Sequence, residues 1–272
     1  MPETIEGFEP LPPPAEIPQA RASATILLAR DGSDGLELFM LERHVQSEFA
    51  GAFVFPGGTL DDGDHDPSLA GLVDGLDPLA KEMGVQDPGL GRALVVCAIR
   101  ETFEESGVLL ARTAEGEPVG LDGPEWQERR DAVDAGEMTA AELARSANIR
   151  YAADKLRFWQ RWLTPIHNPK RYDTFFFVAH LPEGQAALHD AVETTDSTWI
   201  SPSEALRHGE DGTFAIVFPT RKTLESVAVC ETAEALWEAA SGRPNAIVQP
   251  RILVHEDAVK VQVTPDGPLF DP

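Results

Sequence analysis

Residues 93–108 constrain the fold of this chain more than any other stretch. Read as an α-helix, at about 100° per residue, they present an apolar side suited to a protein core and an acidic side opposite it. Gly107 is expected to end the helix, because glycine readily adopts the left-handed conformation favoured there. The apolar side consists of Val95, Val96, Ile99, Phe103 and, further along, Leu110, and the acidic side consists of Glu101, Glu104 and Glu105.

The three glutamates stand at positions i, i+3 and i+4 of this helix. Carboxylates at these spacings repel one another by a few tenths of a kcal/mol per pair, so something is expected to offset their charge. One explanation is a solvated acidic face, which is the commoner case for an isolated triplet. The other is a divalent cation, because hard cations such as Mg²⁺ take oxygen ligands and hold substrate phosphates. The choice between them depends on the rest of the chain.

The segment upstream of the helix favours the cation. Phe55-Pro56-Gly57-Gly58 and the later run Arg100-Glu101-Thr102-Phe103-Glu104-Glu105-Ser106-Gly107-Val108 together resemble the Nudix hydrolase box, G-x5-E-x7-R-E-U-x-E-E-x-G-U, where U is apolar. Gly58 matches the opening glycine, and Thr102 is a mild departure at an apolar position. Asp64 stands where the box has its first glutamate. Gly58 and Arg100 are separated by 41 residues where the plain box has 13, so the box carries an insertion of 28 residues.

The resemblance predicts an α/β fold, the Nudix α/β/α sandwich with a mixed sheet, an insertion inside the box and extra helices. It also implies a metal-dependent hydrolase that uses Mg²⁺ or Mn²⁺. The expected metal ligands are Glu101, Glu104, Glu105 and, by its position in the box, Asp64.

Further catalytic roles follow from the same resemblance. Arg100 would orient the carboxylates through charge-assisted hydrogen bonds. One helix glutamate, or Glu193 in the loop before Trp199-Ile200, would accept a proton from the attacking water. Gly57 and Gly58 would shape the loop beneath the metal ions, because glycine lets backbone approach a ligand closely.

Segments on either side of the box are similar to the coenzyme A diphosphatase branch of the family. A strand pair at about 24–29 and 36–43 ends in Arg43, and Lys170 and Arg171 precede an apolar strand at 175–179. The resemblance implies coenzyme A or acyl-CoA as substrate, split into phosphopantetheine and adenosine 3′,5′-bisphosphate. Arg43, Lys170 and Arg171 are then candidate substrate-binding residues, although Lys170 and Arg171 are equally explained as surface charges on a turn.

Other substrates and a different class of function stay open. The coenzyme A signature upstream of the box keeps one arginine, Arg43, while Glu48 stands near the place of the second. ADP-ribose, NAD(H) or another nucleoside diphosphate derivative is therefore the alternative substrate class. The third interpretation is a Nudix-shaped binding module without catalysis, against which the retention of Arg100 and all three helix glutamates argues.

The chain divides into three parts by pattern. Residues 1–21 contain six prolines and are interpreted as an extended tail, and residues 22–205 as the Nudix domain. The domain holds the insertion at about 65–91 and a helical segment at about 122–163, within which a Thr139-x-x-Glu142 capping box begins a helix. The insertion is expected beside the catalytic face, either as a wall that selects bulky substrates, which we favour, or as a segment tolerated at the surface, where added length costs little. Residues 206–272 are expected to form helices and strands packed on the domain.

The composition of the chain limits the classes of partner that it is expected to bind. A formal charge of −24 argues against nucleic acid, which requires a basic surface. No apolar run approaches the ~20 residues needed to span a bilayer, so no membrane partner is expected. Two cysteines indicate no disulfide framework, and we expect a cytoplasmic protein. The expected partner is a small nucleoside diphosphate substrate, with a homodimer through the strands at 247–263 as a further hypothesis.

Overall fold

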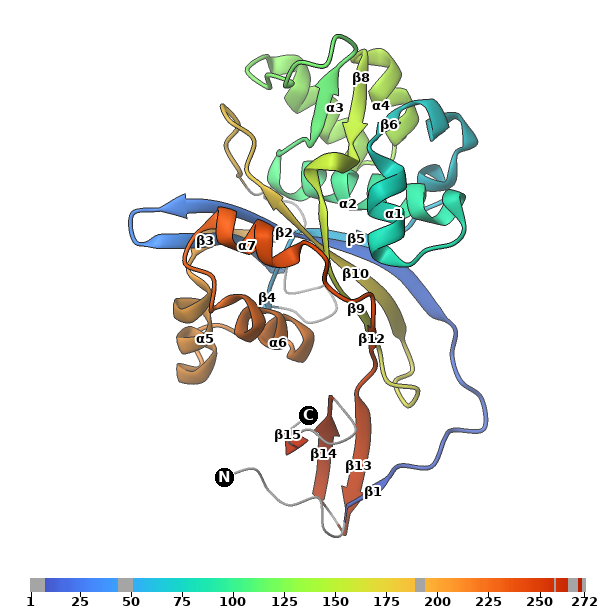
Figure 1. The fold of residues 1–272 in the computed structure, drawn as a ribbon, viewed down its shortest axis with the longest axis vertical. Coiled ribbons are helices and arrows are strands. Elements are labelled where there is room, and N and C mark those ends of the chain that lie inside the picture. The colour runs from blue at the N-terminus through green and yellow to red at the C-terminus, as the bar shows by residue number, and fades with distance from the viewer. Residues whose placement is uncertain (1–7, 44–50, 189–193, 257, 264–268, 271–272) are drawn as a thin grey trace.

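A mixed sheet of eight strands between two layers of helices forms the centre of the molecule (Figure 1). The computed structural model describes residues 8–43, 51–188, 194–256, 258–263 and 269–270. The strand order is β11-β3-β2-β10-β9-β12, with β4 paired to β3 and β5 paired to β2. The strands are β2 (Ala20–Gly32), β3 (Gly35–Arg43), β4 (Phe53–Val54), β5 (Gly57–Thr59), β9 (Arg157–Leu163), β10 (Arg171–His180), β11 (Thr194–Ile200) and β12 (Ile247–Val248).

Apolar side chains point to both faces of the central strands, and this explains why the sheet lies between two layers of helices. In β2, Ala24, Ile26 and Leu28 enter the hydrophobic core on one face of the sheet, whereas Leu27 and Ala29 enter the core on the other. Because successive side chains of a strand point to opposite faces, a strand that is apolar throughout must be covered on both sides. The predicted α/β/α sandwich with a mixed sheet is confirmed.

The layer over one face is built around α2 (Pro88–Ser106), the helix with the glutamates. It begins five residues before the predicted stretch, with Pro88 in its first turn and the Asp87 carboxylate accepting a hydrogen bond from the Gly89 N–H (2.8 Å). Gly107, at φ 71°, ends it as predicted. The predicted core residues Val95, Ile99 and Phe103 are at most 1% exposed.

Smaller elements complete this layer. α1 (Leu76–Met83), α3 (Pro124–Asp134) and α4 (Ala140–Ser146) lie near α2, and the three-stranded sheet β6-β8-β7 accompanies them (Figure 1). Its strands are β6 (Val73–Asp74), β7 (Ala111–Thr113) and β8 (Ile149–Ala152). Thr139 and Glu142 form the predicted capping box at the start of α4.

The other face of the sheet is covered by α5 (Pro202–Asp211), α6 (Phe218–Val227) and α7 (Ala233–Ala240). Leu224 and Leu236 from this layer are fully buried against the sheet. A separate four-stranded sheet, β1-β13-β14-β15, brings residues from both ends of the chain together (Figure 1). Its strands are β1 (Glu9–Pro10), β13 (Arg251–His255), β14 (Ala258–Gln262) and β15 (Leu269–Phe270).

The predicted helical segment at 122–163 is wrong over its last part. α3 and α4 are present, but residues 149–152 form β8 and residues 157–163 form β9. A bulge in β9 explains the misleading helical spacing: Gln160 pairs with Phe176 but Phe158 pairs with Phe177, so Trp159 is an extra residue. Phe158 therefore enters the core beside α2, while Trp159 and Trp162 enter the other core.

The interpretation of residues 1–21 as an extended tail is wrong in two places. Glu9–Pro10 is strand β1, and Ala20 and Arg21 begin β2, in parallel register with Arg171 and Tyr172 of β10. The division into a Nudix domain and a following segment stays a prediction.

The insertion is folded rather than loop-like. Residues 65–91 include the 3₁₀ helix η2 (Pro67–Gly71), β6, α1 and the start of α2, and Leu69, Leu79 and Met83 are buried in the core around α2. It thus packs against α2 as part of the hydrophobic core. Its expected role as a wall that selects bulky substrates stays a prediction.

Two further expectations can be compared with the fold. Cys97 and Cys230 are both free, as predicted, and Cys97 is buried. Across the described ranges, no helix is long and apolar enough to cross a membrane.

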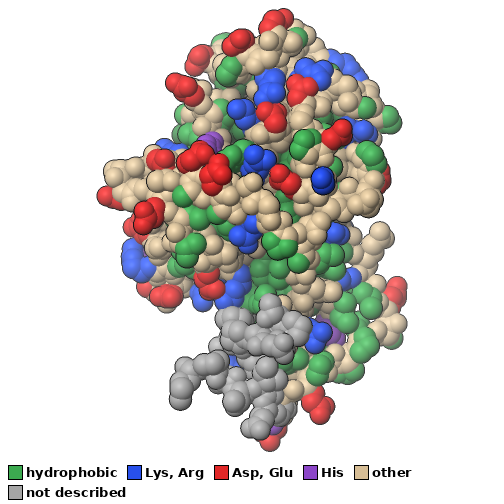
Figure 2. Space-filling model, in the orientation of Figure 1, with side chains coloured by type: hydrophobic (Ala, Val, Ile, Leu, Met, Phe, Trp, Pro, Cys, Tyr) green, Lys and Arg blue, Asp and Glu red, His purple; other side chains and the backbone are tan. Residues whose placement is uncertain are grey.

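Basic and acidic side chains are interspersed over the face shown in Figure 2, with acidic ones frequent along its upper and left margins.

Candidate active site

A pocket of about 430 Å³ opens where β2, β5 and β10 meet the acidic end of α2. Residues from eight elements and their flanks contribute to it. The lining residues are Arg21, Ser23, Thr25, Arg43, Val54, Phe55, Gly57, Gly58, Thr59, Glu101, Glu104, Glu105, Asp134, Tyr172, Thr174, Phe176, Val217, Pro219 and Thr220. All three helix glutamates therefore reach one cavity, together with the glycine loop.

The glycine loop lies directly against the carboxylates. The Gly57 N–H donates a hydrogen bond to Glu105 Oε2 (2.8 Å). A Cβ at Gly58 would come within 2.4 Å of the Glu101 carboxylate, and a Cβ at Gly57 within 2.3 Å of the Ala24 carbonyl oxygen. Gly57 requires glycine, because a side chain would collide with the backbone of β2, whereas a side chain at Gly58 would displace the Glu101 carboxylate. The predicted close approach of backbone to the glutamates is present.

Arg100 lies beneath the glutamates and holds two of them. Its Nη1 donates to both oxygens of Glu104 (3.0 and 3.1 Å) and forms an ion pair with Glu101 Oε1 (3.0 Å). Burial opposes the charge of this guanidinium, but its hydrogen bonds to Asp64 and the nearby carboxylates together raise its pKa. Arg100 therefore stays charged and is bonded to both carboxylates; its role in orienting them for catalysis stays a prediction.

Asp64 occupies the other edge of the same guanidinium. It belongs to the short 3₁₀ helix η1 (Gly63–His65), is fully buried, and accepts hydrogen bonds from Arg100 Nε at Oδ1 (3.0 Å) and Nη2 at Oδ2 (2.9 Å). Its Oδ2 also accepts from the Asp61 N–H (3.1 Å). Asp64 does not line the pocket, so the structure favours a positioning role through Arg100 over the expected role as metal ligand.

Burial strongly perturbs Glu104. Desolvation raises the pKa of its carboxyl to about 7, although the Arg100 charge acts in the opposite direction. Glu104 is 9% exposed, and Glu105 is 6% exposed. The acidic side of α2 is thus buried around a cavity, and the interpretation as a solvated face does not apply.

The other predicted site residues fall into two groups. Arg43, Gly57 and Gly58 line the pocket with the glutamates, whereas Lys170 and Arg171 do not. Arg171 is 8% exposed and donates from Nε to the Thr164 carbonyl (3.1 Å) and from Nη1 to the Pro18 carbonyl (2.8 Å), which ties the start of β10 to the segment before β2. Lys170 is exposed on the preceding turn, and Glu193 lies outside the described residues.

Sequence reasoning missed the polar floor formed by two parallel strands. Arg21 and Ser23 of β2 stand in register with Tyr172 and Thr174 of β10, and the Ser23 and Thr174 hydroxyls lie 2.7 Å apart. On β2 the signal was present as alternation, because Arg21, Ser23 and Thr25 are polar at every second position, whereas on β10 only Tyr172 and Thr174 are, and Phe176 follows them. Asp134, Val217, Pro219 and Thr220 carried no such signal, because they reach the pocket from helix ends distant in sequence.

The donor set suits a hard divalent cation. Its carboxylate oxygens come from one rigid helix, and the missing Cβ of Gly58 leaves room beside Glu101. As these side chains stand, no group of three or more His, Cys, Asp or Glu among the described residues is gathered closely enough to hold a metal. Glu101, Glu104 and Glu105 all line the cavity, so their carboxylates are the groups that would hold such an ion.

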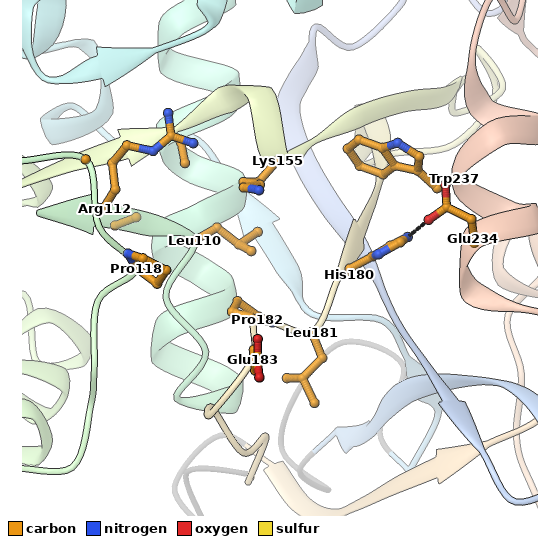
Figure 3. A pocket seen from close by; sticks show the side chains of 13 residues that line it. Leu110, Arg112, Pro118, Lys155, His180, Leu181, Pro182, Glu183, Glu234 and Trp237 are labelled. Atoms are coloured by element: carbon orange, nitrogen blue, oxygen red, sulfur yellow. Dashed lines mark ion pairs between the residues drawn. The ribbon is translucent and has the colours of Figure 1, made fainter.

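A second pocket, of about 530 Å³, lies at the opposite end of β10 (Figure 3). It is lined by Leu110, Lys155, Trp237 and the His180–Glu234 pair, whose Nε2 and Oε2 atoms are 3.9 Å apart. Tyr172 lines the first pocket and His180 the second, and eight residues of strand place them ~26 Å apart. No described residue of α2 lines the second pocket, so the glutamate pocket is the candidate active site.

Comparison with solved structures supports the fold. The crystal structure of a NUDIX hydrolase from Alicyclobacillus acidocaldarius is similar to this chain, with a TM-score of 0.66 at 25% sequence identity. The similarity covers 84% of this chain and 98% of that chain. The α2 glutamates, the glycine loop and the sandwich thus occur within a fold already known in this class of protein.

Sequence comparison gives the family. A family model described as the NUDT19 Nudix domain matches residues 86–221, half of the chain. The chain belongs to the Nudix hydrolase family, whose members generally use divalent metal ions.

Two curated relatives carry the same name. The chain is 28% identical over 211 residues to acyl-coenzyme A diphosphatase NUDT19 of Xenopus laevis, covering 65% of this chain and 56% of that protein. It is 29% identical over 216 residues to acyl-coenzyme A diphosphatase NUDT19 of Homo sapiens, covering 64% of this chain and 55% of that protein. The chain thus spans little more than half the length of the curated relatives it matches.

Proposed function

We propose that this chain hydrolyses the diphosphate linkage of a nucleoside diphosphate derivative in a metal-dependent reaction, with coenzyme A or acyl-CoA as the first candidate substrate. One observation carries the proposal: Glu101, Glu104 and Glu105 converge on a cavity whose rim includes Arg21 and Arg43. Arg100 is shared among Glu101, Glu104 and Asp64, so its single positive charge does not balance the carboxylates at the cavity, and a divalent cation would compensate the rest.

A Mg²⁺ or Mn²⁺ ion held by these glutamates would neutralise phosphate charge and lower the pKa of an attacking water. The chain's own residues set the geometry. Arg100 fixes Glu101 and Glu104, and the Gly57 N–H fixes Glu105, so the carboxylates are oriented before substrate arrives.

Glu104 is the proton acceptor that we favour. It lines the pocket together with Glu101 and Glu105, and a carboxylate at that place could accept a proton from the attacking water. The water oxygen would form a bond to one phosphorus while the bond from that phosphorus to the bridging oxygen breaks, and the bridging oxygen leaves with the other phosphate. Glu193 remains a second proposed base.

The substrate is proposed from two supports. The curated relatives are named acyl-coenzyme A diphosphatases, and Arg43, the arginine kept from the coenzyme A signature, lines the pocket. ADP-ribose or NAD(H) is the alternative, because the diphosphate site alone does not distinguish these molecules. The third interpretation, a binding module without catalysis, is less favoured because Arg100 and all three glutamates are in place.

A substrate panel tests the proposal. Coenzyme A, an acyl-CoA, ADP-ribose and NADH would be incubated with the protein and either Mg²⁺ or Mn²⁺, and the products identified by mass. We expect 4′-phosphopantetheine and adenosine 3′,5′-bisphosphate from coenzyme A. Cleavage of ADP-ribose or NADH alone would establish the alternative, and no cleavage with either metal would favour the binding module. The homodimer and the cytoplasmic location stay predictions.

A further inference from the structure

Four polar side chains on one face of the sheet line the floor of the candidate active site. Arg21 and Ser23 come from β2, Thr59 from β5 and Thr174 from β10. Ser23 is paired with Thr59 on one side and with Thr174 on the other. Paired residues of neighbouring strands point to the same face, as does every second residue along a strand, so all four side chains share that face. We call these four residues the donor platform.

Arg21 supplies a positive charge that no acid of the protein neutralises. Its Nη2 donates a hydrogen bond to Thr59 Oγ1 (3.2 Å), which orients the guanidinium. Within the part of the chain that the structure describes, it forms no ion pair with a carboxylate, although the chain has 46 acidic residues against 22 lysines and arginines. A guanidinium has five N–H donors and no acceptor, so most of its donors are left for a ligand. The ligand that suits such a group is an anion.

The hydroxyls beside Arg21 add further donors. The Ser23 and Thr174 hydroxyls lie 2.7 Å apart, so one donates a hydrogen bond to the other. Such a bond uses only one of the two hydroxyl protons, and none of the described residues accepts the second. Thr59, which accepts from Arg21, likewise keeps a proton that no described residue accepts. The donor platform therefore offers the pocket a guanidinium and two hydroxyl protons, and none of its four side chains is a carboxylate.

The donor platform is separate from the glutamates. Along β2, Ala24 enters the core around α2, so its neighbour Ser23 faces the opposite side of the sheet. Thr59 lies two residues along β5 from Gly57, whose N–H binds Glu105, and two residues of strand span ~7 Å. A phosphate held through a cation at the glutamates and an anion held on the platform are therefore two different groups, although both places line one cavity.

We propose that the donor platform binds a phosphomonoester on the ribose of the substrate, directly and without a metal ion, while the diphosphate lies at the glutamates. This inference rests on the proposed function and narrows it. Coenzyme A carries such a group as its 3′-phosphate, one ribose ring away from its diphosphate, whereas ADP-ribose and NAD(H) carry none. The donor platform therefore selects the coenzyme A class over the alternative class.

Direct binding tests the donor platform without turnover. Calorimetry in the presence of EDTA would compare adenosine 3′,5′-bisphosphate with adenosine 5′-phosphate on the wild type, on Arg21→Met and on the double variant Ser23→Ala/Thr174→Val. Methionine keeps a long unbranched side chain but removes the charge and the donors. We expect the wild type to prefer the bisphosphate, Arg21→Met to lose about tenfold of that preference, and the double variant to lose about threefold.

Arg30→Met is the matched control, because it removes the same charge from the far end of β2. Arg30 is paired with Glu37 and does not line the pocket, so this variant should keep the preference for the bisphosphate. An equal loss in Arg30→Met would reduce the preference to a long-range charge effect and overturn the inference.

Three further results would also overturn it. A wild type that binds neither nucleotide, or binds both equally, would show that the donor platform holds no second phosphate. Equal weakening of both nucleotides in Arg21→Met would place the guanidinium at the shared 5′-phosphate. An unchanged preference in Arg21→Met or in the double variant would exclude the altered side chains from binding.

Hydrolysis measured separately keeps this test apart from the proposed function. If the wild type cleaves coenzyme A but Arg21→Met keeps the preference for the bisphosphate, the function stands and the role of the donor platform is wrong. If Arg21→Met loses the preference but the wild type does not cleave coenzyme A with Mg²⁺ or Mn²⁺, the donor platform binds a phosphomonoester and the proposed substrate is wrong.

Discussion

Replacing Asp64 by asparagine tests the assignment of this residue as a support for Arg100. The side chain is fully buried and binds the guanidinium at both oxygens, 3.0 and 2.9 Å away. Removing one partner of a buried ion pair costs about 3–5 kcal/mol when the other charge is left alone. Arg100 would still have Glu101 and Glu104, so we take the lower end, about 3 kcal/mol.

The loss is measured by urea unfolding followed by tryptophan fluorescence. For a chain of this size, a loss of about 3 kcal/mol corresponds to a fall in Tm of roughly 6–12 °C. Asp62→Asn is the matched control, because Asp62 is exposed two residues away and caps no helix with its side chain; it should change stability by less than about 0.5 kcal/mol.

A metal titration separates the two roles of Asp64. If Asp64 only positions Arg100, Asp64→Asn should lose stability in EDTA as well as with Mn²⁺, and the loss should be similar in both. If Asp64→Asn were as stable as the wild type in EDTA but bound Mn²⁺ at least tenfold more weakly, this reasoning would be refuted. Asp64 would then be a metal ligand, as its place in the box implied.

Three further changes test the layer around α2. Phe103→Ala should lower the free energy of unfolding by about 3–5 kcal/mol, because removing a ring that is 1% exposed and contacts Trp126 edge-on leaves a cavity. Urea unfolding measures this loss, and a value below about 1 kcal/mol would contradict the packing. Leu79→Ala in the insertion should cost about 2–4 kcal/mol in the same assay, whereas an effect near zero would show that the insertion is dispensable. In EDTA, the free energy of unfolding should fall by about 3 kcal/mol as pH rises from about 4.5 to 7, because folded Glu104, with its pKa raised to about 7, keeps a proton that the unfolded chain releases. Glu104→Gln should flatten that slope in pH-dependent urea unfolding, and an unchanged slope would assign it to another group.

The central helix and its chemistry could be predicted because local rules and tertiary structure agree there. Its apolar positions pack on the sheet, Gly107 ends it, and its glutamates meet the glycine loop. Thr102, at an apolar position of the box, is accommodated because its hydroxyl donates to the Ala98 carbonyl (2.8 Å) within the helix. The helix, its apolar side and its end follow from local spacing, whereas the approach of the glycine loop to the glutamates followed from the resemblance to the Nudix box.

The features that the sequence analysis missed depend on contacts between residues distant in sequence, which the spacing of residues along the chain does not show. Trp159 is placed by a bulge opposite β10, and without that partner its spacing from Trp162 suits a helix. The charge of Arg171 made it a candidate for substrate binding or for a surface charge on a turn, but the carbonyl groups that bind it belong to residues 164 and 18. Thr220 enters the site only because Ala215 pairs with β4, which no local pattern around residue 220 shows.

Turnover of coenzyme A by Glu105→Gln tests the central claim most directly. Glu105 lines the pocket and is fixed by the Gly57 N–H, and glutamine keeps its shape while removing its charge. Glu128→Gln is the matched control, because Glu128 is an exposed residue of α3. With saturating Mg²⁺, we predict that kcat of Glu105→Gln falls at least ~100-fold while its urea unfolding curve stays close to that of the wild type and Glu128→Gln keeps full activity. Wild-type turnover by a folded Glu105→Gln would contradict the assignment of catalysis to this pocket.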